Sequence, residues 1–457
     1  MRRRAVALAA AVLAVLTACS SKAPLPSVAG PSEQTVSSPT PGAPTGDGDW
    51  PTYHRDNSRA GLAAGLPPLG TLATAWKADL DGAVYGQPLI VGDLLLAATE
   101  HDTVYGLDAN TGKVRWSKHL GEPVPRSQLP CGNIDPLGIT GTMVYDPSTG
   151  LVFALAETTG AHHTLYGLDA GTGAVKVTRV AEAPKGEPVA HQQRAALTLF
   201  QNRIYIAYGG LAGDCAKYIG SVIALPTTGS APALSYAVPT PREGGIWTPA
   251  GASVHNGHLL YAVGNGESAD AYDGSDSVLA LDADLKLADR FSPTEWADDN
   301  KRDLDLGSMT PVVVNNFVFA DGKRGIGYTL RPDHFGEIGG QVADSPLCAA
   351  FGGPAVRDDV VYVACSNGLH AVRIDTAGQM HQLWQGPKAA TGSPVLGGGA
   401  VWVVDVDGGV LYALDQTSGA IRQKITIGRA PHFASPSLAH GRAYVGTMTG
   451  VVAVNGV

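Results

Sequence analysis

A six-residue turn, Leu-Asp-x-x-Thr-Gly, recurs along the chain and constrains its fold more than any other feature. It occurs at Asp108 and Asp169, and at Asp415 with Ser418 in place of the threonine. Eight copies about 40 to 60 residues apart match the period of four-stranded propeller blades. The five weaker copies lie at residues 225–229, 281–286, 331–336, 374–378 and 454–456.

A second pattern runs in phase with the first. Before each turn lies a pair of short apolar runs joined by a dipeptide such as Gly-Asp or Asn-Gly, which is typical of β-hairpins. The 58 glycines and 31 prolines also favour many short strands and turns. We therefore predict an all-β, eight-bladed propeller of four-stranded antiparallel blades over residues 49–457. The hairpins are expected at residues 86–99, 141–156, 195–208, 249–264, 309–321, 352–365, 392–405 and 434–447.

The last repeat ends at Val457, just after its third strand. A ring left open there would expose a strand edge, and closure by a strand from the other terminus removes that edge. Residues 71–80 are predicted to supply this strand, because Trp76 takes the position that Trp116 holds in blade one.

The first 48 residues read as an export and anchoring segment. Three arginines and a 14-residue apolar run make residues 1–18 a secretory signal peptide. The stretch "LTAC" resembles the lipobox of bacterial lipoproteins, which implies acylation of Cys19, for instance by palmitate. Residues 19–48 are rich in Ser, Pro, Thr and Gly and predict a disordered tether. We expect an exported protein held on a cell membrane, outside the cytoplasm.

Three stretches have a recognisable pattern: "VYGLDANTGKVRW" (104–116), "LYALDQTSGAIR" (411–422) and "DWPTYHRDNSRAG" (49–61). They resemble the pyrroloquinoline quinone (PQQ) repeat family of eight-bladed propellers. The family includes the quinoprotein alcohol dehydrogenases and the scaffold lipoprotein of the outer-membrane barrel-assembly machine. The resemblance covers residues 49–457 and implies the fold, while leaving open an enzyme or a scaffold, because one fold carries both.

The two faces of the predicted ring differ in their loops. Turns between strands one and two and between strands three and four are short and share one face. The links between blades and the strand two-to-three loops are longer and share the other, where binding usually resides. We expect a ligand-binding rim on this long-loop face, formed by Gln193, Arg194, Glu243, Trp247 and Phe433.

Four cysteines follow Cys19, and all four fall on the long-loop face in two neighbouring pairs. An even number of cysteines in an exported chain favours disulfides. The predicted bonds are Cys131–Cys215 and Cys348–Cys365.

Three residues of the long-loop face are candidates for catalysis or metal binding. Asp303 and Asp305 offer oxygen ligands for calcium; the alternative is a solvated loop in which they pair with Lys301 and Arg302. His432 is a candidate proton shuttle or metal ligand; the alternative is a structural hydrogen bond to a neighbouring blade. No established metal-binding motif supports either metal assignment.

The net charge and the cysteine pattern argue against two classes of function, nucleic-acid binding and PQQ-dependent catalysis. The net charge of −9 argues against a nucleic-acid partner. In the quinoprotein dehydrogenases, PQQ lies between a tryptophan and a disulfide of adjacent cysteines, beside calcium. This sequence has no Cys-Cys pair. We expect a binding or scaffolding module for a cell-envelope protein or a small molecule, and not an enzyme. The alternative is a quinoprotein-like oxidoreductase with a small ligand, or PQQ and calcium, in the central channel.

Overall fold

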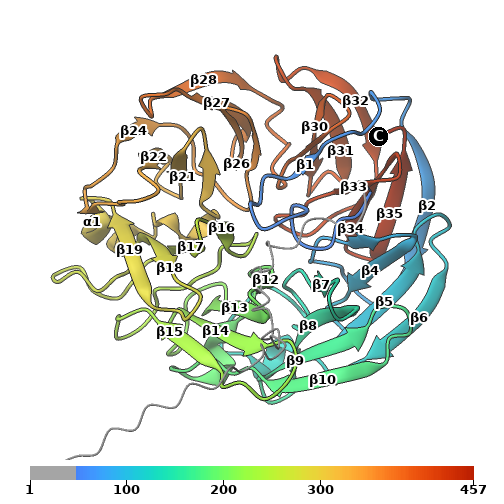
Figure 1. The fold of residues 1–457 in the computed structure, drawn as a ribbon, viewed down its shortest axis with the longest axis horizontal. Helices are drawn as coiled ribbons and strands as arrows, with labels where there is room; N and C mark the ends of the chain where they lie inside the picture. Colours follow the sequence, from blue (N-terminus) through green and yellow to red (C-terminus); the bar gives the residue numbers. More distant parts are fainter. Residues whose placement is uncertain (1–47) are drawn as a thin grey trace, which may run out of the picture. The chain divides into compact units, whose positions relative to one another are not determined.

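The computed structural model describes residues 48–457, which form a ring of eight antiparallel four-stranded sheets (Figure 1). This confirms the predicted propeller. The first four blades are β3–β6 (Leu89–Val91, Leu94–Ala98, Thr103–Asp108, Val114–His119), β7–β10 (Val144–Asp146, Leu151–Thr158, His162–Asp169, Val175–Val180), β12–β15 (Thr198–Phe200, Arg203–Gly210, Ser221–Pro226, Leu234–Ala237) and β16–β19 (Ser253–His255, His258–Val263, Ser277–Leu281, Leu287–Ser292).

The remaining four blades complete the ring in chain order. They are β20, β21, β22 and β24 (Val312–Val314, Phe317–Ala320, Ile326–Leu330, Ala343–Pro346), β25–β28 (Ala355–Arg357, Val360–Cys365, Gly368–Ile374, Met380–Gln385), β29–β32 (Val395–Gly397, Ala400–Asp405, Val410–Asp415, Ile421–Thr426), and β33–β35 with β2 (Ser437–Ala439, Arg442–Thr447, Gly450–Asn455, Ala73–Asp79).

Blade eight is closed by the amino-terminal strand, as predicted. Strand β2 pairs antiparallel with β35, with Trp76 opposite Ala453 and Asp79 opposite Gly450. The outermost strand of this blade thus comes from the start of the propeller and the other three from its end. In Figure 1, β2 (blue) lies against β35 (red).

The repeated turn is a joint between neighbouring blades. In blade one, the Asp108 carboxylate accepts hydrogen bonds from the backbone N–H groups of Asn110 and Thr111, which fixes the turn. Its glycine, Gly112, has a φ of +72° and lies under the ring of Trp76. The Trp76 indole N–H donates to Ala109 O at 3.1 Å. The blade-end tryptophan therefore packs on the next turn.

The same joint recurs around the ring. The Trp116 indole N–H donates to Ala170 O at 3.0 Å, and the ring covers Gly173. Trp384 likewise covers Gly419 and donates to a backbone carbonyl. These tryptophans therefore pack neighbouring blades together.

Residues 49–63 form a plug across one end of the central channel. They bond to the inner strands of several blades: Trp50 with Ile90, Pro51 with Tyr145, Asn57 with Leu199 and Val254, Ala60 with Val356, and Gly61 with Leu396. Within it, β1 (Leu62–Ala63) pairs in parallel with β29. The plug thus gives the channel a floor.

Arg59 anchors this plug from a fully buried position. Its guanidinium donates to Ala252 O at 2.9 Å and to the Thr198 hydroxyl at 2.8 Å, and also to Thr52 and Tyr53 within the plug. Burial lowers the pKa of Arg59 to about 10. One side chain therefore ties the plug to blades three and four.

Short accessory elements lie in the links between blades. On the long-loop face are α1 (Trp296–Arg302), three 3₁₀ turns (Arg126–Gln128, Pro188–Ala190, Leu306–Ser308) and β11 (His191–Gln192). None of the helices in residues 48–457 is long and apolar enough to cross a membrane. The expected signal peptide, Cys19 and almost all of the tether lie outside the described residues.

Blade five departs from the expected pattern. The connection between β22 and β24 was expected to be a short turn at residues 331–336, but it runs from Arg331 to Val342. Within it, β23 (Glu337–Ile338) joins blade four in parallel with β19. Glu337 is fixed there by an ion pair to Arg290 at 2.6 Å. The face with the short turns therefore contains one long connection, in blade five.

The joint predicts that Gly173→Ala costs more stability than Gly150→Ala. Both residues have φ near +70° and lie in turns of blade two, so each substitution costs about 1–2 kcal/mol in backbone strain. A Cβ at Gly173 meets the Trp116 ring at 2.5 Å, whereas one at Gly150 meets nothing within 4 Å. The clash adds about 1–3 kcal/mol, measurable by urea unfolding. Equal losses in the free energy of unfolding for the two variants would contradict the packing of Trp116 on Gly173.

Candidate functional site

A cavity of about 590 Å³ opens on the long-loop face above the plug. Every segment that lines it is an inter-blade link, a strand two-to-three loop or the approach to blade one. The lining residues are Tyr85, Asn133, Ile134, Gln192, Arg194, residues 210–214, Trp247, Pro249, Asp303, Ser308, Lys323, Phe351, Asp407, residues 429–433 and Met448.

Trp247 forms a flat part of the cavity wall. Gly209, Gly245 and Gly264 pack against its indole ring so closely that a Cβ at any of them would overlap it. The indole N–H donates to Gly210 O at 2.9 Å. A large aromatic ring is thereby held in one orientation by backbone on several sides.

A lysine lies over this ring. Lys323 Nζ is 5.7 Å from the centroid of the Trp247 ring, within cation–π range. Nζ also binds the carboxylates of Asp303 and Asp305, the latter at 3.0 Å. Although burial acts to lower the pKa of Lys323, the two carboxylates raise it to about 12. The cavity wall thus carries an ammonium group above an aromatic face, held in place by two carboxylates.

The pairing of these aspartates differs from the solvated-loop alternative. Their partner is Lys323, not Lys301 or Arg302; Arg302 pairs with Asp298 at 3.1 Å. Asp305 is fully buried, and its Oδ1 accepts a hydrogen bond from Gly307 N at 2.8 Å. Asp303 therefore lines the cavity and Asp305 lies behind its wall, and both are paired with Lys323.

Arg194 provides a second cation in the wall. Its guanidinium stacks 5.1 Å from the Phe433 ring centroid and 5.7 Å from that of Tyr85. Nη2 donates to His432 O at 2.7 Å. Within residues 48–457, this carbonyl is the one hydrogen-bond acceptor of the guanidinium. The other N–H groups of Arg194 are therefore free to bind a ligand.

The cavity brings together part of the expected rim. Arg194, Trp247, Asp303, His432 and Phe433 line it. Gln193, Glu243 and Asp305 lie behind the wall. Gln193 Nε2 bonds to Ala195 O, and the carboxylate of Glu243 accepts hydrogen bonds from the Arg242 guanidinium and, at 3.4 Å, from Asn265 Nδ2.

Three lining residues were missed by sequence reasoning. Lys323 follows Asp-Gly in a short hairpin loop, and Tyr85 precedes blade one. Arg429 lies two residues before the "PHF" motif whose His432 and Phe433 were singled out. All three lie in segments of the long-loop face, and this position is the only feature of the sequence that could have pointed to them.

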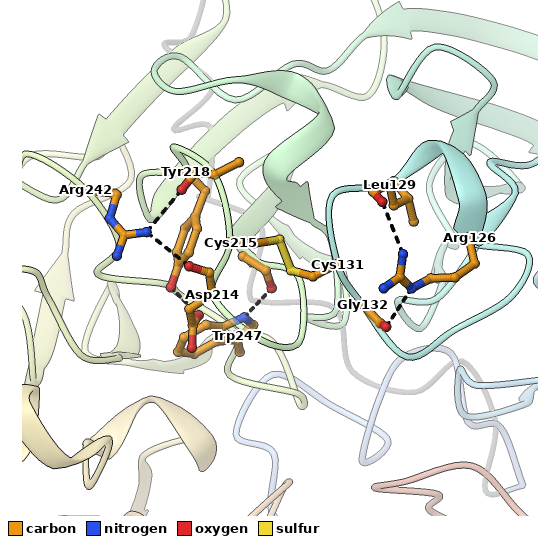
Figure 2. Close-up of a disulfide and its surroundings, with 11 residues drawn as sticks. Arg126, Leu129, Cys131, Gly132, Asp214, Cys215, Tyr218, Arg242 and Trp247 are labelled. Carbon is orange, nitrogen blue, oxygen red and sulfur yellow. Dashed lines mark hydrogen bonds between the residues drawn. A yellow bond between two sulfur atoms is a disulfide. The ribbon is translucent and has the colours of Figure 1, made fainter.

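Both predicted disulfides are confirmed, Cys131–Cys215 and Cys348–Cys365. Figure 2 shows the first, which joins the link into blade two to the loop of blade three. Arg126 donates to Leu129 O and Gly132 O on one side of this bond, and Arg242 donates to Asp214 O on the other. Because Asn133 and Asp214 line the cavity, this disulfide fixes one edge of its mouth.

Buried carboxylates lie behind the cavity wall between blades one and two. Glu100 accepts hydrogen bonds from Gly138 N at 2.8 Å and the Thr140 hydroxyl at 3.0 Å. Burial, partly opposed by these bonds, raises the pKa of Glu100 to about 7. Burial and the carboxylates of Glu100 and Glu157 raise the pKa of Asp102 to about 9. Both acids therefore hold protons near neutral pH.

The family model described as "Outer membrane protein assembly factor BamB" matches residues 71–222 and 250–425, well over half of the chain. The chain belongs to this family. The matched residues contain strands from all eight blades.

Two curated relatives of this family member are polyvinylalcohol dehydrogenases. The one from Sphingopyxis sp. (strain 113P3) is 28% identical over 297 residues, which is 58% of this chain and 42% of the relative. The one from Pseudomonas sp. is 25% identical over 389 residues, 73% of this chain and 58% of the relative. The chain thus spans about half the length of these relatives.

Solved structures of other proteins share the fold. The quinohemoprotein alcohol dehydrogenase of Comamonas testosteroni aligns with a TM-score of 0.67 at 16% identity, covering 89% of this chain and 80% of that one. BamB from Moraxella catarrhalis aligns with a TM-score of 0.60 at 18% identity, covering 84% and 99%. Similarity at this level establishes the fold.

The buried carboxylates make stability depend on pH. The pKa of Asp102 is higher in the folded chain than in the unfolded one, so stability falls as pH rises between about 4 and 9. Asp102→Asn should reduce this slope by up to about 1 kcal/mol per pH unit between pH 5 and 8, as measured by urea unfolding. Asp108→Asn is the control: its pKa is lowered to about 2, chiefly by Arg115, so the slope above pH 5 should not change. An unchanged slope in Asp102→Asn would contradict the assignment.

Proposed function

We propose that this protein is a binding module that works through its long-loop face, and that the cavity takes a flat, anionic aromatic small molecule. The observation that carries this proposal is the pairing of cations with aromatic rings in one cavity: Lys323 over Trp247, and Arg194 between Tyr85 and Phe433. Aromatic rings favour stacking with a planar ligand, and guanidinium groups favour carboxylates.

PQQ, a planar ring system with three carboxylates, has this chemistry. The N–H groups of Arg194 that do not bond to His432, and the one N–H of Lys323 that Asp303 and Asp305 leave over, would hold carboxylates, and Trp247 would lie against the rings. The volume of about 590 Å³ is in the range of ordinary small-molecule pockets. When bound, PQQ supplies two-electron redox chemistry. These residues therefore fit the organic cofactor.

The same residues do not fit a calcium ion beside it. Glu243 is already neutralised by Arg242, and Asp305 by Lys323. Within residues 48–457, the one group of three His, Cys, Asp or Glu side chains close enough to share an ion lies elsewhere, in blade six. A calcium site here would require both carboxylates to give up their present partners.

A quinoprotein-type oxidoreductase is the second candidate. It is favoured by Asp303, a carboxylate that lines the cavity next to Lys323, and by the two relatives named as polyvinylalcohol dehydrogenases. A scaffold for a cell-envelope protein remains a third use of the same face, suggested by the description of the family. In that case the rim loops, and not the cavity, would carry the contact.

Titration with PQQ tests whether the cavity binds this ligand. We expect one molecule to bind per chain, measured by calorimetry and by quenching of tryptophan fluorescence. Arg194→Gln and Lys323→Met should each weaken binding about 10- to 100-fold, because a charge-assisted hydrogen bond contributes about 1.5–3 kcal/mol. Arg115→Gln, on the opposite face, is the control and should bind as the unmodified chain does.

The outcomes distinguish the candidates. Absence of binding by PQQ and by simpler aromatic carboxylates would contradict the ligand proposed here. Reduction of an artificial electron acceptor by the PQQ-loaded chain, with an alcohol present, would support the oxidoreductase. Loss of that activity in Asp303→Asn, with PQQ affinity unchanged, would assign the carboxylate a role in the reaction.

We further propose that the chain is exported and anchored through acylated Cys19, so that the propeller faces outside the cytoplasm. The apolar run and "LTAC" support this proposal. The protein from cells should partition into detergent and carry a lipid-modified amino terminus at Cys19 by mass spectrometry. Cys19→Ser should move it to the aqueous fraction; an aqueous unmodified chain would contradict the anchor.

A further inference from the structure

Blade six contains a cluster of ligating side chains that takes no part in the cavity. Cys348 lies in the link between β24 and β25, Cys365 ends β26, and His370 lies in β27. One sulfur from each cysteine and one imidazole nitrogen all lie within 4.8 Å of one another. All three residues are buried, with exposures of 8%, 1% and 3%.

The hairpin register explains why these side chains meet. Val363 is opposite His370 across the β26–β27 ladder, and Cys365 is opposite Gly368. Side chains two residues apart on a strand share one face of a sheet, so Cys365, Val363 and His370 lie on the same face. Ala350 forms a β-bridge with Cys365, which brings the link that carries Cys348 alongside the end of β26.

The imidazole is oriented with one nitrogen free. His370 Nε2 is 2.9 Å from Asn367 Oδ1, which only accepts hydrogen bonds, so Nε2 carries the proton. Nδ1 is buried and makes no hydrogen bond. A buried polar atom without a partner is unfavourable. One nitrogen of this imidazole lies within 4.8 Å of both sulfurs.

We propose that Cys348, Cys365 and His370 form a zinc site when their disulfide is reduced. A dithiol reductant would break the S–S bond by thiol–disulfide exchange, becoming a disulfide itself and leaving two thiols. Zn²⁺ would then bind as both thiols release their protons to solvent, giving two Zn–S bonds and one Zn–N bond. Two cysteines and one histidine are a known zinc ligand set, with water in the fourth position.

The site is reached from the exposed end of the hairpin. Ser366 and Asn367, at the turn between β26 and β27, are exposed, and Cys348 is the least buried of the three ligands. The oxidised chain holds the sulfurs in a bond with each other, which prevents metal binding. This site is independent of the function proposed for the cavity, because none of its three ligands lines that cavity.

The test uses Co²⁺ as a spectroscopic substitute for Zn²⁺ on the full chain. Two double variants separate the disulfides: Cys131→Ser/Cys215→Ser keeps the blade-six pair, and Cys348→Ser/Cys365→Ser keeps the other. After reduction and removal of the reductant without oxygen, only the first should bind one Co²⁺ with thiolate charge-transfer absorbance. Zn²⁺ should displace the cobalt, and the oxidised chain should bind neither.

His370 is tested by two further substitutions in the first double variant. Asn367→Ala removes the acceptor that orients the ring and should weaken Zn²⁺ binding about 10- to 100-fold. His370→Ala should weaken it at least as much, with circular dichroism confirming that both remain folded. Equal cobalt binding by the two double variants, or unchanged affinity in Asn367→Ala and in any folded His370→Ala, would overturn the proposal.

Discussion

The pairing of β2 with β35 is the constraint on which the rest of the structure depends. It joins a strand near the start of the propeller to one near its end, and thereby removes the open edge of blade eight. The cavity is lined by segments from around the ring, so its geometry exists only when the ring is closed. The Trp76 joint, from β2 to the first turn, continues the closure into blade one.

The plug is tied to the inner strands of the ring. Residues 49–63 bond to these strands, and Arg59 satisfies the carbonyls and hydroxyls of neighbouring segments from a fully buried position. In the cavity, Arg194 and Lys323 are already held by His432 O and by two carboxylates, so little ordering of these side chains is left to occur on binding. The two disulfides lie in the loops of the open face and restrict those loops further.

The fold was predictable because each copy of the repeat specifies the same strands and turn of one blade. The Asp-x-x-Thr-Gly turn specifies strands three and four of a blade, and the matching positions of Trp76 and Trp116 identify the closing strand. Blade five was not predictable: β23 leaves it for blade four, and the contact that fixes Glu337 comes from Arg290, 47 residues earlier. Local pattern does not encode such distant pairing.

The candidate site was predictable as a face and not as a set of contacts. Loop length and motifs pointed to Arg194, Trp247 and Phe433, which do line the cavity. The cradle of Trp247 comes from glycines in three separate segments, and the partner of Asp305 is Lys323 in another hairpin. These depend on how blades are positioned around the axis, which sequence spacing alone does not give.

The function proposed for the cavity requires that a flat, anionic aromatic molecule binds to it on the long-loop face. Hydrogen exchange measured by mass spectrometry, with and without saturating PQQ, tests it most directly. Protection is predicted in the segments 209–214, 243–249, 321–324 and 428–433, which contribute Trp247, Lys323 and the Arg194 contacts. Unchanged exchange in these segments, or protection confined to the turns at 109–113 and 170–174 on the opposite face, would contradict it.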